Sequence, residues 1–587
     1  MQIFARHELA TTVPDNGHPR LLLEGSWPAA AADAKKNKPL ALDDLFDGRH
    51  AAIDAEAERL AERIAAAVRR PSPDQPSFAD VNILKLRYAA VKWLRPLAWR
   101  RSLSPPMRPQ HYELHVSTDG EDAEYSALWQ ALAAADGCDL QTIEAPATRT
   151  DSPMASLKNS VWRRRLARWS ESLRQLRASG NSPTRVLLCG NPRLLDPLCA
   201  EFVRRGISTA WLYDRFAVQS GIRWSLRGVP TFTCDEAGPS ISPTSTPQLG
   251  ESIRYDRVDL TAVVRTWLER RQAEVGDAQA RQARRIEDHV ATFRPTHVVV
   301  DEDATPLPRM LLAAAQSGGA RTAVVQHGAC GIRFGFAPLK ADRFLAADIG
   351  SKKQLTAWGV AADRVVVTGS PYRARFFAEL HAAGRASPST SRRNILLLAT
   401  VPPRERRPDA VEYHFTTRTY EQMLLTACTA VAELPGCELV VRRHPRDAGV
   451  AMLTRVLAQL PQLKYRISSH REKLGQLVAA ADCVLSCASS SGIEAAAAGA
   501  AVVQLLPAGS GNLLPAEWYG LLGTARTIDE LRPLLQHALD DWKQPPNTSS
   551  ESPQDAAQRL AEAVLYSAET IRRPHFADSK RVEAKHA

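Results

Sequence analysis

The 587-residue sequence predicts an α/β protein with two Rossmann-type domains that face each other across a cleft, preceded by a helical N-terminal extension. Three observations predict this class. The chain is longer than one hydrophobic core usually supports. From about residue 111, short apolar runs such as THVVV (296–300) alternate with helical stretches, which is the pattern of parallel βαβ units. A polar segment, AGRASPSTSRR (383–393), divides this series into two sets.

Residues 1–110 are expected to form a helical, basic extension. Ala51 to Arg70 predicts one helix, which ends at the proline-rich segment 71–76. Ile83 to Arg101 carries apolar residues at helical spacing and predicts a second helix, which Pro96 should kink or end. Serine and proline at 102–109 then predict a linker.

The first Rossmann-type domain is expected over residues 111–385. Its predicted strands are Arg185–Cys189, Thr296–Val300, Arg321–Gln326, Arg343–Ala346 and Arg364–Thr368, with helices at Pro308–Ala315 and Ser351–Trp358.

The second such domain is expected over residues 386–548, and residues 549–587 should add a last helix, about Asp555 to Arg572, and a tail. The predicted strands are Asn394–Ala399, Glu438–Val441, Lys464–Ile467, Cys483–Ser486 and Ala501–Leu506, with helices at Thr416–Leu434, Val450–Leu460, Leu474–Ala481 and Ile528–Asp541. Ligands of such sheets bind at the carboxyl ends of the strands.

Composition restricts the class of protein. The nine cysteines form no CxxC pair, which favours reduced thiols and a cytoplasmic location. No signal peptide is expected, and the longest apolar run is too short to span a bilayer. A net charge of +11 suits phosphate-bearing substrates, an anionic membrane surface or nucleic acid. A nucleic-acid partner is disfavoured because the sequence contains no recognised nucleic-acid-binding module.

A serine run opens a predicted helix after the strand Cys483–Ser486. Ser489, Ser490, Ser491 and Gly492 stand at the helix N-terminus, where free N–H groups, the helix dipole and hydroxyls suit a phosphate. Glu494 lies one turn further on, where its carboxylate can accept hydrogen bonds from ribose hydroxyls.

A basic turn, RRHP (442–445), follows another strand of the same domain. Arg443 can hold a phosphate, and His444 can donate a hydrogen bond to one or act as an acid. The alternative interpretation is a solvated basic loop.

Together these motifs resemble those of the GT-B glycosyltransferases, over roughly residues 295–510. Strand–RRHP and strand–SSSG–helix look like the HP and Ser/Thr motifs of sialyltransferases, Kdo transferases of capsule synthesis and teichoic-acid glycerophosphate transferases. The string EAAAAG (494–499) is similar to that of the lipid II N-acetylglucosaminyltransferase, whose matching glutamate binds ribose. The resemblance implies a metal-independent enzyme without a cofactor, whose nucleotide-sugar donor, with cytidine or uridine left open, lies on the second domain.

The first domain carries the candidate acceptor-side residues. His327 ends a strand and is placed for general-base work, and Gly328 permits close approach of the substrate. The QHG motif (326–328) is typical of the capsule and teichoic transferases. A structural histidine is the alternative.

Asp301 and Asp303 follow the THVVV strand, and either can act as a base or orient His327. The alternatives are a metal-binding D-x-D motif of the GT-A fold or an acid cluster that caps the next helix. The resemblance also places Gly369 and Ser370 beside the donor phosphates.

Two tryptophan- and arginine-rich segments, 81–110 and 156–178, suit contact with an anionic inner-membrane surface, or else simple packing on the core. The resulting hypothesis is a cytoplasmic, peripherally membrane-bound glycosyltransferase that extends a surface polysaccharide or lipid-linked glycan of capsule or lipopolysaccharide synthesis. The alternatives are a UDP-N-acetylglucosamine 2-epimerase-like enzyme, a CDP-glycerol-type phosphotransferase, and a basic nucleic-acid-binding or scaffold protein.

Overall fold

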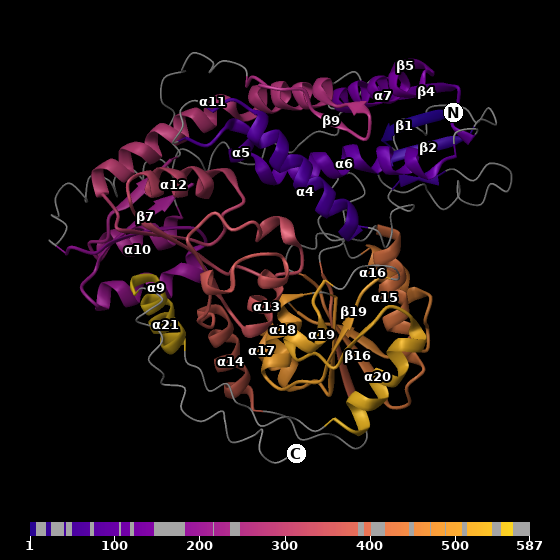
Figure 1. Ribbon diagram of the computed structural model, residues 1–587. Coiled ribbons are helices and arrows are strands. Elements are labelled where there is room, and N and C mark those ends of the chain that lie inside the picture. Colours follow the sequence, from indigo (N-terminus) through magenta and orange to yellow (C-terminus); the bar gives the residue numbers. More distant parts are fainter. Residues whose placement is uncertain are drawn as a thin grey trace, which may run out of the picture.

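A computed structural model describes most of the chain (Figure 1). The described residues are 1–6, 19–24, 40–42, 50–70, 75–104, 107–117, 122–145, 182–214, 217–234, 247–384, 393–400, 417–444, 451–469, 471–487, 489–507, 513–542 and 553–566. The second tryptophan-rich segment, 156–178, and Pro445 lie outside them. Within this part, no helix combines the length and apolar content that a membrane crossing requires.

Three parallel sheets organise the molecule, and all three share one strand order. Read in chain order from the edge, each runs 3-2-1-4-5, the Rossmann order, and two of them continue beyond it. The predicted α/β class with two Rossmann-type sheets is therefore confirmed, and a third sheet of the same kind is added.

The N-terminal sheet has the order β3-β2-β1-β4-β5. Its strands are β1 (Gln2–Arg6), β2 (Arg20–Glu24), β3 (Leu40–Ala41), β4 (His111–Ser117) and β5 (Asp139–Ala145). The helices of this N-terminal domain are α4 (His50–Ala67), α5 (Phe78–Val81), α6 (Ile83–Ser102) and α7 (Ala123–Asp136).

The expected helical extension is corrected by this sheet. Residues 1–110 contribute three strands, and β1 pairs with β4 so that Ile3 lies in register with Leu114. The sheet thus crosses the expected boundary at residue 110. Helix α6 also continues through Pro96, which is buried within it.

The middle sheet has the order β14-β13-β12-β11-β6-β7-β8. Its strands are β6 (Arg185–Cys189), β7 (Ser208–Tyr213), β8 (Thr231–Thr233), β11 (His297–Val300), β12 (Arg321–Val325), β13 (Arg343–Ala346) and β14 (Val365–Val367). Around it lie α9 (Pro192–Arg204), α10 (Val218–Leu226), α12 (Pro306–Ser317), α13 (Ile349–Ala357) and the 3₁₀ turns Arg333–Gly335 and Ala362–Arg364.

The C-terminal sheet has the order β17-β16-β15-β18-β19-β20. Its strands are β15 (Arg393–Leu398), β16 (Cys437–Arg442), β17 (Tyr465–Ile467), β18 (Cys483–Ser486), β19 (Val502–Leu505) and β20 (Gly523–Ala525). Its helices are α15 (Thr417–Ala432), α16 (Ala451–Ala458), α17 (Leu474–Ala479), α18 (Ser490–Ala497), α19 (Ala516–Tyr519) and α20 (Ile528–Asp540).

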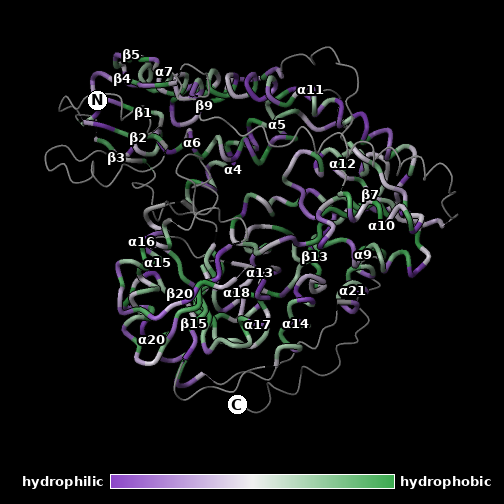
Figure 2. Tube along the Cα trace, turned by 180° about the vertical axis from the view of Figure 1, so that it is seen from behind, coloured by the Kyte–Doolittle hydropathy of each residue, from purple (hydrophilic) through white to green (hydrophobic). Residues whose placement is uncertain are grey.

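Burial on both faces explains why the central strands read as continuous apolar runs. All four residues of β11, β18 and β19 are buried. Figure 2 shows the apolar residues of the C-terminal domain concentrated along its strands, with polar residues on surrounding helices such as α20.

A 33-residue helix, α11 (Thr261–Phe293), joins the N-terminal and middle domains along the top of the molecule (Figure 1). The small antiparallel ribbon of β9 (Arg254–Tyr255) and β10 (Val258–Asp259) precedes it. One end of the helix buries Trp267 and Leu268 in the N-terminal core, and the other end buries Ile286 and Phe293 in the middle core.

Two helices cross between the middle and C-terminal domains. Helix α14 (Pro371–Ala383) follows the last middle strand, yet its Phe376 and Phe377 are buried with strand residues of the C-terminal sheet. Helix α21 (Pro553–Leu565) follows the C-terminal domain, yet its Leu560 packs in the middle core against α9. The two domains are therefore interlocked.

The first tryptophan-rich segment belongs to the core and not to the surface. Trp93 is fully buried, Trp99 is 6% exposed, and Arg100 of the same helix is buried against Asp136. In α6 the packing interpretation holds, and the expectation that its tryptophans contact a membrane surface is wrong.

Candidate active site

The switch point of the C-terminal sheet lies between β15 and β18, where the strand order reverses. Leu398 of β15 is in register with Arg442 of β16 on one side and with Ser486 of β18 on the other. The basic turn and the serine loop therefore start at the same level of one sheet edge. Two strand spacings, about 10 Å, separate their starting points.

The serine loop forms the N-terminus of α18. Ser489 is the N-cap residue, and its Oγ accepts a hydrogen bond of 3.3 Å from the N–H of Ser491. The N–H of Ser489 is in turn 3.4 Å from Oγ of Ser486. The Ser490 N–H has no partner among the described residues, and its side chain is exposed. This amide and the adjacent hydroxyls are available to an anion.

Glu494 is the most unusual side chain of this helix. It is 6% exposed, and its carboxylate accepts no hydrogen bond from any residue that the structure describes. Burial raises the pKa of Glu494 to about 7; nearby Arg373 lowers the pKa and Glu379 raises it. A buried carboxyl group without a partner is costly, so such a group marks a candidate ligand contact.

Arg373 is a site residue that the sequence reasoning missed. It lies in the first turn of α14, donates to Oδ2 of Asp348 at 2.7 Å and acts electrostatically on Glu494. The only sequence signal was a basic residue just after the helix start Ser370–Pro371. The packing of α14 against the C-terminal domain brings this arginine near Glu494.

Gly369 and Ser370 form the turn that opens α14. Gly369 has a φ of 80°, which favours glycine, and the carbonyl before it accepts a bond from Arg559 of α21 at 3.0 Å. Ser370 is the residue before the first turn, and its side chain makes no capping bond. This turn and Arg373 therefore share one helix end.

The two arginines of the basic turn have different surroundings. Nη1 of Arg442 donates to the carbonyl of Glu472 at 2.8 Å, so this side chain braces the neighbouring loop. Nε of Arg443 is buried and lacks a hydrogen-bond partner in the described part of the chain, and His444 next to it is half-buried. Arg443 is therefore the arginine available to an anion.

The middle sheet has its own switch point, between β6 and β11. Oδ2 of Asp301 accepts a bond of 2.8 Å from the N–H of Asn191, which follows β6. Burial raises the pKa of the Asp301 carboxyl, and the Asn191 hydrogen bond opposes the shift. The carboxylate of Asp301 thus joins two strand ends.

His327 is oriented by the backbone of Asp301 and not by a carboxylate. Its Nδ1 lies 2.7 Å from the Asp301 carbonyl oxygen, and its ring stacks on Phe336 at 5.1 Å between centroids. A carbonyl only accepts, so Nδ1 is the donor, and in the neutral imidazole Nε2 then carries the lone pair. The side chain is exposed, which leaves Nε2 able to take a proton.

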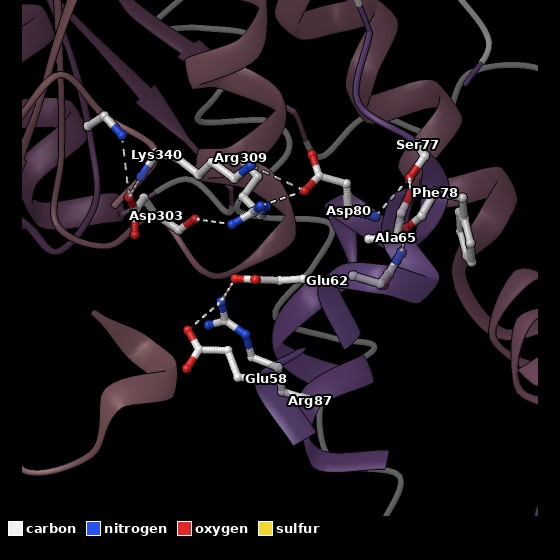
Figure 3. A network of polar contacts seen from close by, with 12 residues as sticks. Glu58, Glu62, Ala65, Ser77, Phe78, Asp80, Arg87, Asp303, Arg309 and Lys340 are labelled. Atoms are coloured by element: carbon white, nitrogen blue, oxygen red, sulfur yellow. Dashed lines mark hydrogen bonds and ion pairs between the residues drawn. The ribbon is translucent and has the colours of Figure 1, made fainter. Parts of the chain in front are cut away.

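Asp303 has a different position from the one expected. It is 3% exposed, and its Oδ2 accepts bonds from the N–H groups of Lys340 at 2.6 Å and Ala341 at 3.4 Å (Figure 3). Burial raises the pKa of this carboxyl. Because the Asp303 carboxylate is buried and bound to backbone N–H groups, its position does not support the prediction that it acts as a base or orients His327.

The acidic run does not converge on one point. Glu302 accepts a hydrogen bond from Thr305 at 2.7 Å, while Asp301 and Asp303 bind separate backbone segments. Among the described residues, no three histidine, cysteine or acidic side chains gather as a metal-binding set. The helix-capping alternative is not supported either, because Glu302 accepts from the Thr305 hydroxyl and α12 has no side-chain capping bond at its start.

The loops at the carboxyl ends of the middle and C-terminal sheets meet. A Cβ at Gly331, in the loop after His327, would lie 4.0 Å from Leu514, in the segment after β19. Gly350 of α13 approaches the carbonyl of Trp518 so closely that a Cβ would be 2.6 Å away. Gln326 fixes Gly328 by donating to its carbonyl at 2.7 Å. The loop after His327 thus adjoins the C-terminal domain.

Comparisons with known proteins give low-identity structural similarities. No family model and no curated protein matches the chain. The UDP-N-acetylglucosamine 2-epimerase of Neisseria meningitidis, solved with UDP-GlcNAc, is 13% identical over 65% of this chain and 99% of its own (TM-score 0.40). MurG of Acinetobacter baumannii is 12% identical over 65% and 99% (TM-score 0.40). The wall teichoic acid polymerase TagF is 11% identical over 71% and 100% (TM-score 0.30).

Proposed function

We propose that this protein is a metal-independent glycosyltransferase of the GT-B type that uses a nucleotide-activated sugar. One observation carries the proposal: Glu494, a buried carboxyl group that accepts no hydrogen bond from the described residues, lies one turn inside a serine-capped helix at the switch point of a Rossmann-type sheet, near Arg373. Such a site offers both phosphate donors and a ribose acceptor.

On the donor side, the nucleotide lies on the C-terminal domain. The α18 N-terminus with Ser489, Ser490 and Ser491 receives a phosphate, and Glu494 accepts hydrogen bonds from ribose hydroxyls. Arg373 and Arg443 supply positive charge to the diphosphate. Two guanidinium groups and a helix N-terminus stabilise negative charge that develops on a leaving phosphate.

On the acceptor side, Nε2 of His327 takes the proton of the acceptor hydroxyl. The acceptor oxygen forms a bond to the anomeric carbon while the bond from that carbon to the phosphate oxygen breaks. The nucleotide leaves with the electron pair, and its charge is held by Arg373, Arg443 and the α18 N-terminus. His444 acts as a donor to the same phosphate.

The acceptor class, a growing surface polysaccharide or a lipid-linked glycan, stays part of this proposal, as does a peripheral position at the inner membrane. The buried tryptophans of α6 do not serve that contact, and the segment 156–178 stays a candidate for it.

Nucleotide binding tests the donor site. Isothermal titration with UDP, CDP and CMP should give saturable binding to the wild-type chain, and Glu494→Gln should weaken the preferred nucleoside diphosphate about tenfold or more, since a hydrogen bond to a charged group is worth about 1.5–3 kcal/mol. Inorganic pyrophosphate, which lacks ribose, should bind both chains equally. Glu433→Gln, an exposed position of the same domain, is the matched control. Absence of nucleotide binding would reject the proposal.

The product identifies the reaction. A glycosyltransferase releases the nucleoside diphosphate from a UDP-sugar, or CMP from a CMP-sugar, only when acceptor is present. An epimerase changes the nucleotide sugar alone, and a CDP-glycerol-type enzyme releases CMP. Strongly salt-dependent binding to arbitrary DNA without nucleotide binding would favour the nucleic-acid alternative.

A further inference from the structure

We propose that Arg87, in the N-terminal domain, is a positioning residue for His327 and acts through the segment 328–341. This inference rests on the proposed function of His327. It gives the N-terminal domain a direct part in the acceptor side of the site, although its sheet lies outside the two facing domains.

The first link joins Arg87 to Phe334. Arg87 is 2% exposed, and its Nη1 donates to the carbonyl oxygen of Phe334 at 2.7 Å. Its guanidinium also lies over the Phe334 ring, 5.8 Å from the centroid. Phe334 is itself 1% exposed and belongs to the hydrophobic core of the N-terminal domain, where Tyr88 meets it edge-on. A residue of the middle domain is thus held inside another domain.

The second link leads from Phe334 to the imidazole. Arg333 to Gly335 form a 3₁₀ turn, which the N–H groups of Phe336 and Ala337 close by donating to the Arg333 carbonyl at 3.0 and 2.9 Å. Phe336 follows this turn directly and stacks on His327 with its ring plane only 7° from parallel. A shift of the turn therefore moves the surface on which His327 rests.

The buried carboxylate of Glu58 explains why position 87 carries an arginine. Glu58 of α4 lies 3.7 Å from Arg87 and 2.5 Å from Nε of Arg333, so one carboxylate joins the two sides of the domain boundary (Figure 3 shows the Arg87 side). Burial raises the pKa of Glu58, and the two arginines oppose that shift. Removing Arg87 leaves a buried carboxylate short of one cation.

The far end of the segment is anchored in the same way. Asp303 binds the N–H of Lys340, and Arg309 joins the Asp303 carbonyl at 3.1 Å to Asp80 of α5 at 2.7 Å (Figure 3). Both anchors thus connect the loop after His327 to helices of the N-terminal domain. Only the Arg87 anchor lies next to the turn that carries Phe336.

Arg87→Met tests the inference, with Arg100→Met as the matched control. Both arginines are buried in α6, but Arg100 pairs with Asp136 inside the N-terminal domain. We expect Arg87→Met to lower kcat about 10- to 100-fold, because a misplacement of about 1 Å costs rate on that scale. The donor KM and the nucleotide Kd should not change. Arg100→Met should lower thermal stability with little effect on kcat.

Hydrogen–deuterium exchange gives a readout that does not depend on activity. Arg87→Met should accelerate exchange in peptides covering residues 328–338, and Arg100→Met should not. Arg87→Lys keeps a cation beside Glu58 and should fold even if the methionine variant does not, with intermediate exchange and intermediate kcat. Unchanged exchange in this segment, or equal kcat losses in both methionine variants, would overturn the inference. If the wild-type chain does not bind nucleotides, the proposed function is rejected instead.

Discussion

Gly492 lies directly against Ser486: an ideal Cβ at Gly492 would fall 2.2 Å from Oγ and 2.5 Å from Cβ of that serine. Only a residue without a side chain lets α18 begin this close to β18. The contact therefore sets the height of the helix N-terminus above the sheet edge, and with it the place of Ser489 to Ser491.

Gly492→Ala should accordingly displace the serine loop. We expect at least a tenfold loss of nucleoside diphosphate affinity, because the anion-binding groups move together, and a lower melting temperature from overpacking of about 1–3 kcal/mol. Calorimetric titration and thermal unfolding measure the two effects. Gly318→Ala, where the nearest atom is 3.4 Å away, is the control and should leave both unchanged. Full affinity in Gly492→Ala would mean that the loop is not the phosphate site.

His327→Ala should abolish most turnover and spare the donor site. General-base catalysis contributes about 10²- to 10⁴-fold, so kcat should fall within that range while the nucleotide Kd stays constant. Coupled detection of released nucleotide measures the rate. His537→Ala, a half-exposed histidine of α20, should behave as wild type. A His327→Ala chain with normal kcat would remove the general-base role.

The buried carboxyl group of Glu494 should lower the free energy of unfolding of the ligand-free chain at neutral pH. Its pKa is about 7 in the folded chain and ordinarily 4.5, so the unfolded state binds fewer protons between these values and the folded state loses stability as pH rises. The full penalty, about 3 kcal/mol, is reached above pH 7 and vanishes below about pH 4.5. Without ligand, Glu494→Gln should therefore melt at a higher temperature than wild type at pH 8, and at the same temperature near pH 4.5.

Nucleotide binding should show the matching pH dependence. If ribose hydroxyls donate to the ionised carboxylate, wild-type affinity should rise between pH 6 and 8, and that rise should be absent in Glu494→Gln. Equal pH profiles in the two chains would place Glu494 outside the binding site.

The stability of the middle domain should depend on α21, although this helix follows the C-terminal domain in the chain. Leu560 of α21 is fully buried beside α9, so Leu560→Ala should cost about 2–5 kcal/mol. Faster hydrogen exchange in α9 would report the loss in the middle domain. Val203→Ala, at a 39% exposed position of α9, should change stability by less than about 0.5 kcal/mol. Damage confined to the C-terminal domain would contradict the interlocked arrangement.

The sequence predicted the central strands well, because a strand buried on both faces has a continuous apolar run. Arg343–Ala346 and Cys483–Ser486 were predicted with the observed ends. It did not predict the N-terminal sheet, because that sheet pairs strands far apart in the chain, such as Gln2–Arg6 with His111–Ser117. Local patterns contain no information on such pairing.

The candidate site was likewise predicted only where local sequence patterns determine the position of a residue. The serine loop and RRHP turn could be placed at one sheet edge because strand ends set their position. Arg373 could not be found, since it reaches the site only because α14 leaves its own domain. The position of Asp303 was predicted wrongly because three acids follow one strand and only packing decides which of them turns inward.

The crossing of α14 and α21 also limits how the two large lobes can move. The two helices contact each other, so the helix that the middle domain packs on the C-terminal core lies beside the helix that packs on the middle core. Two lobes held together by one such helix pair are expected to rotate relative to each other about that pair. Any opening to admit a sugar nucleotide should therefore widen with distance from this helix pair.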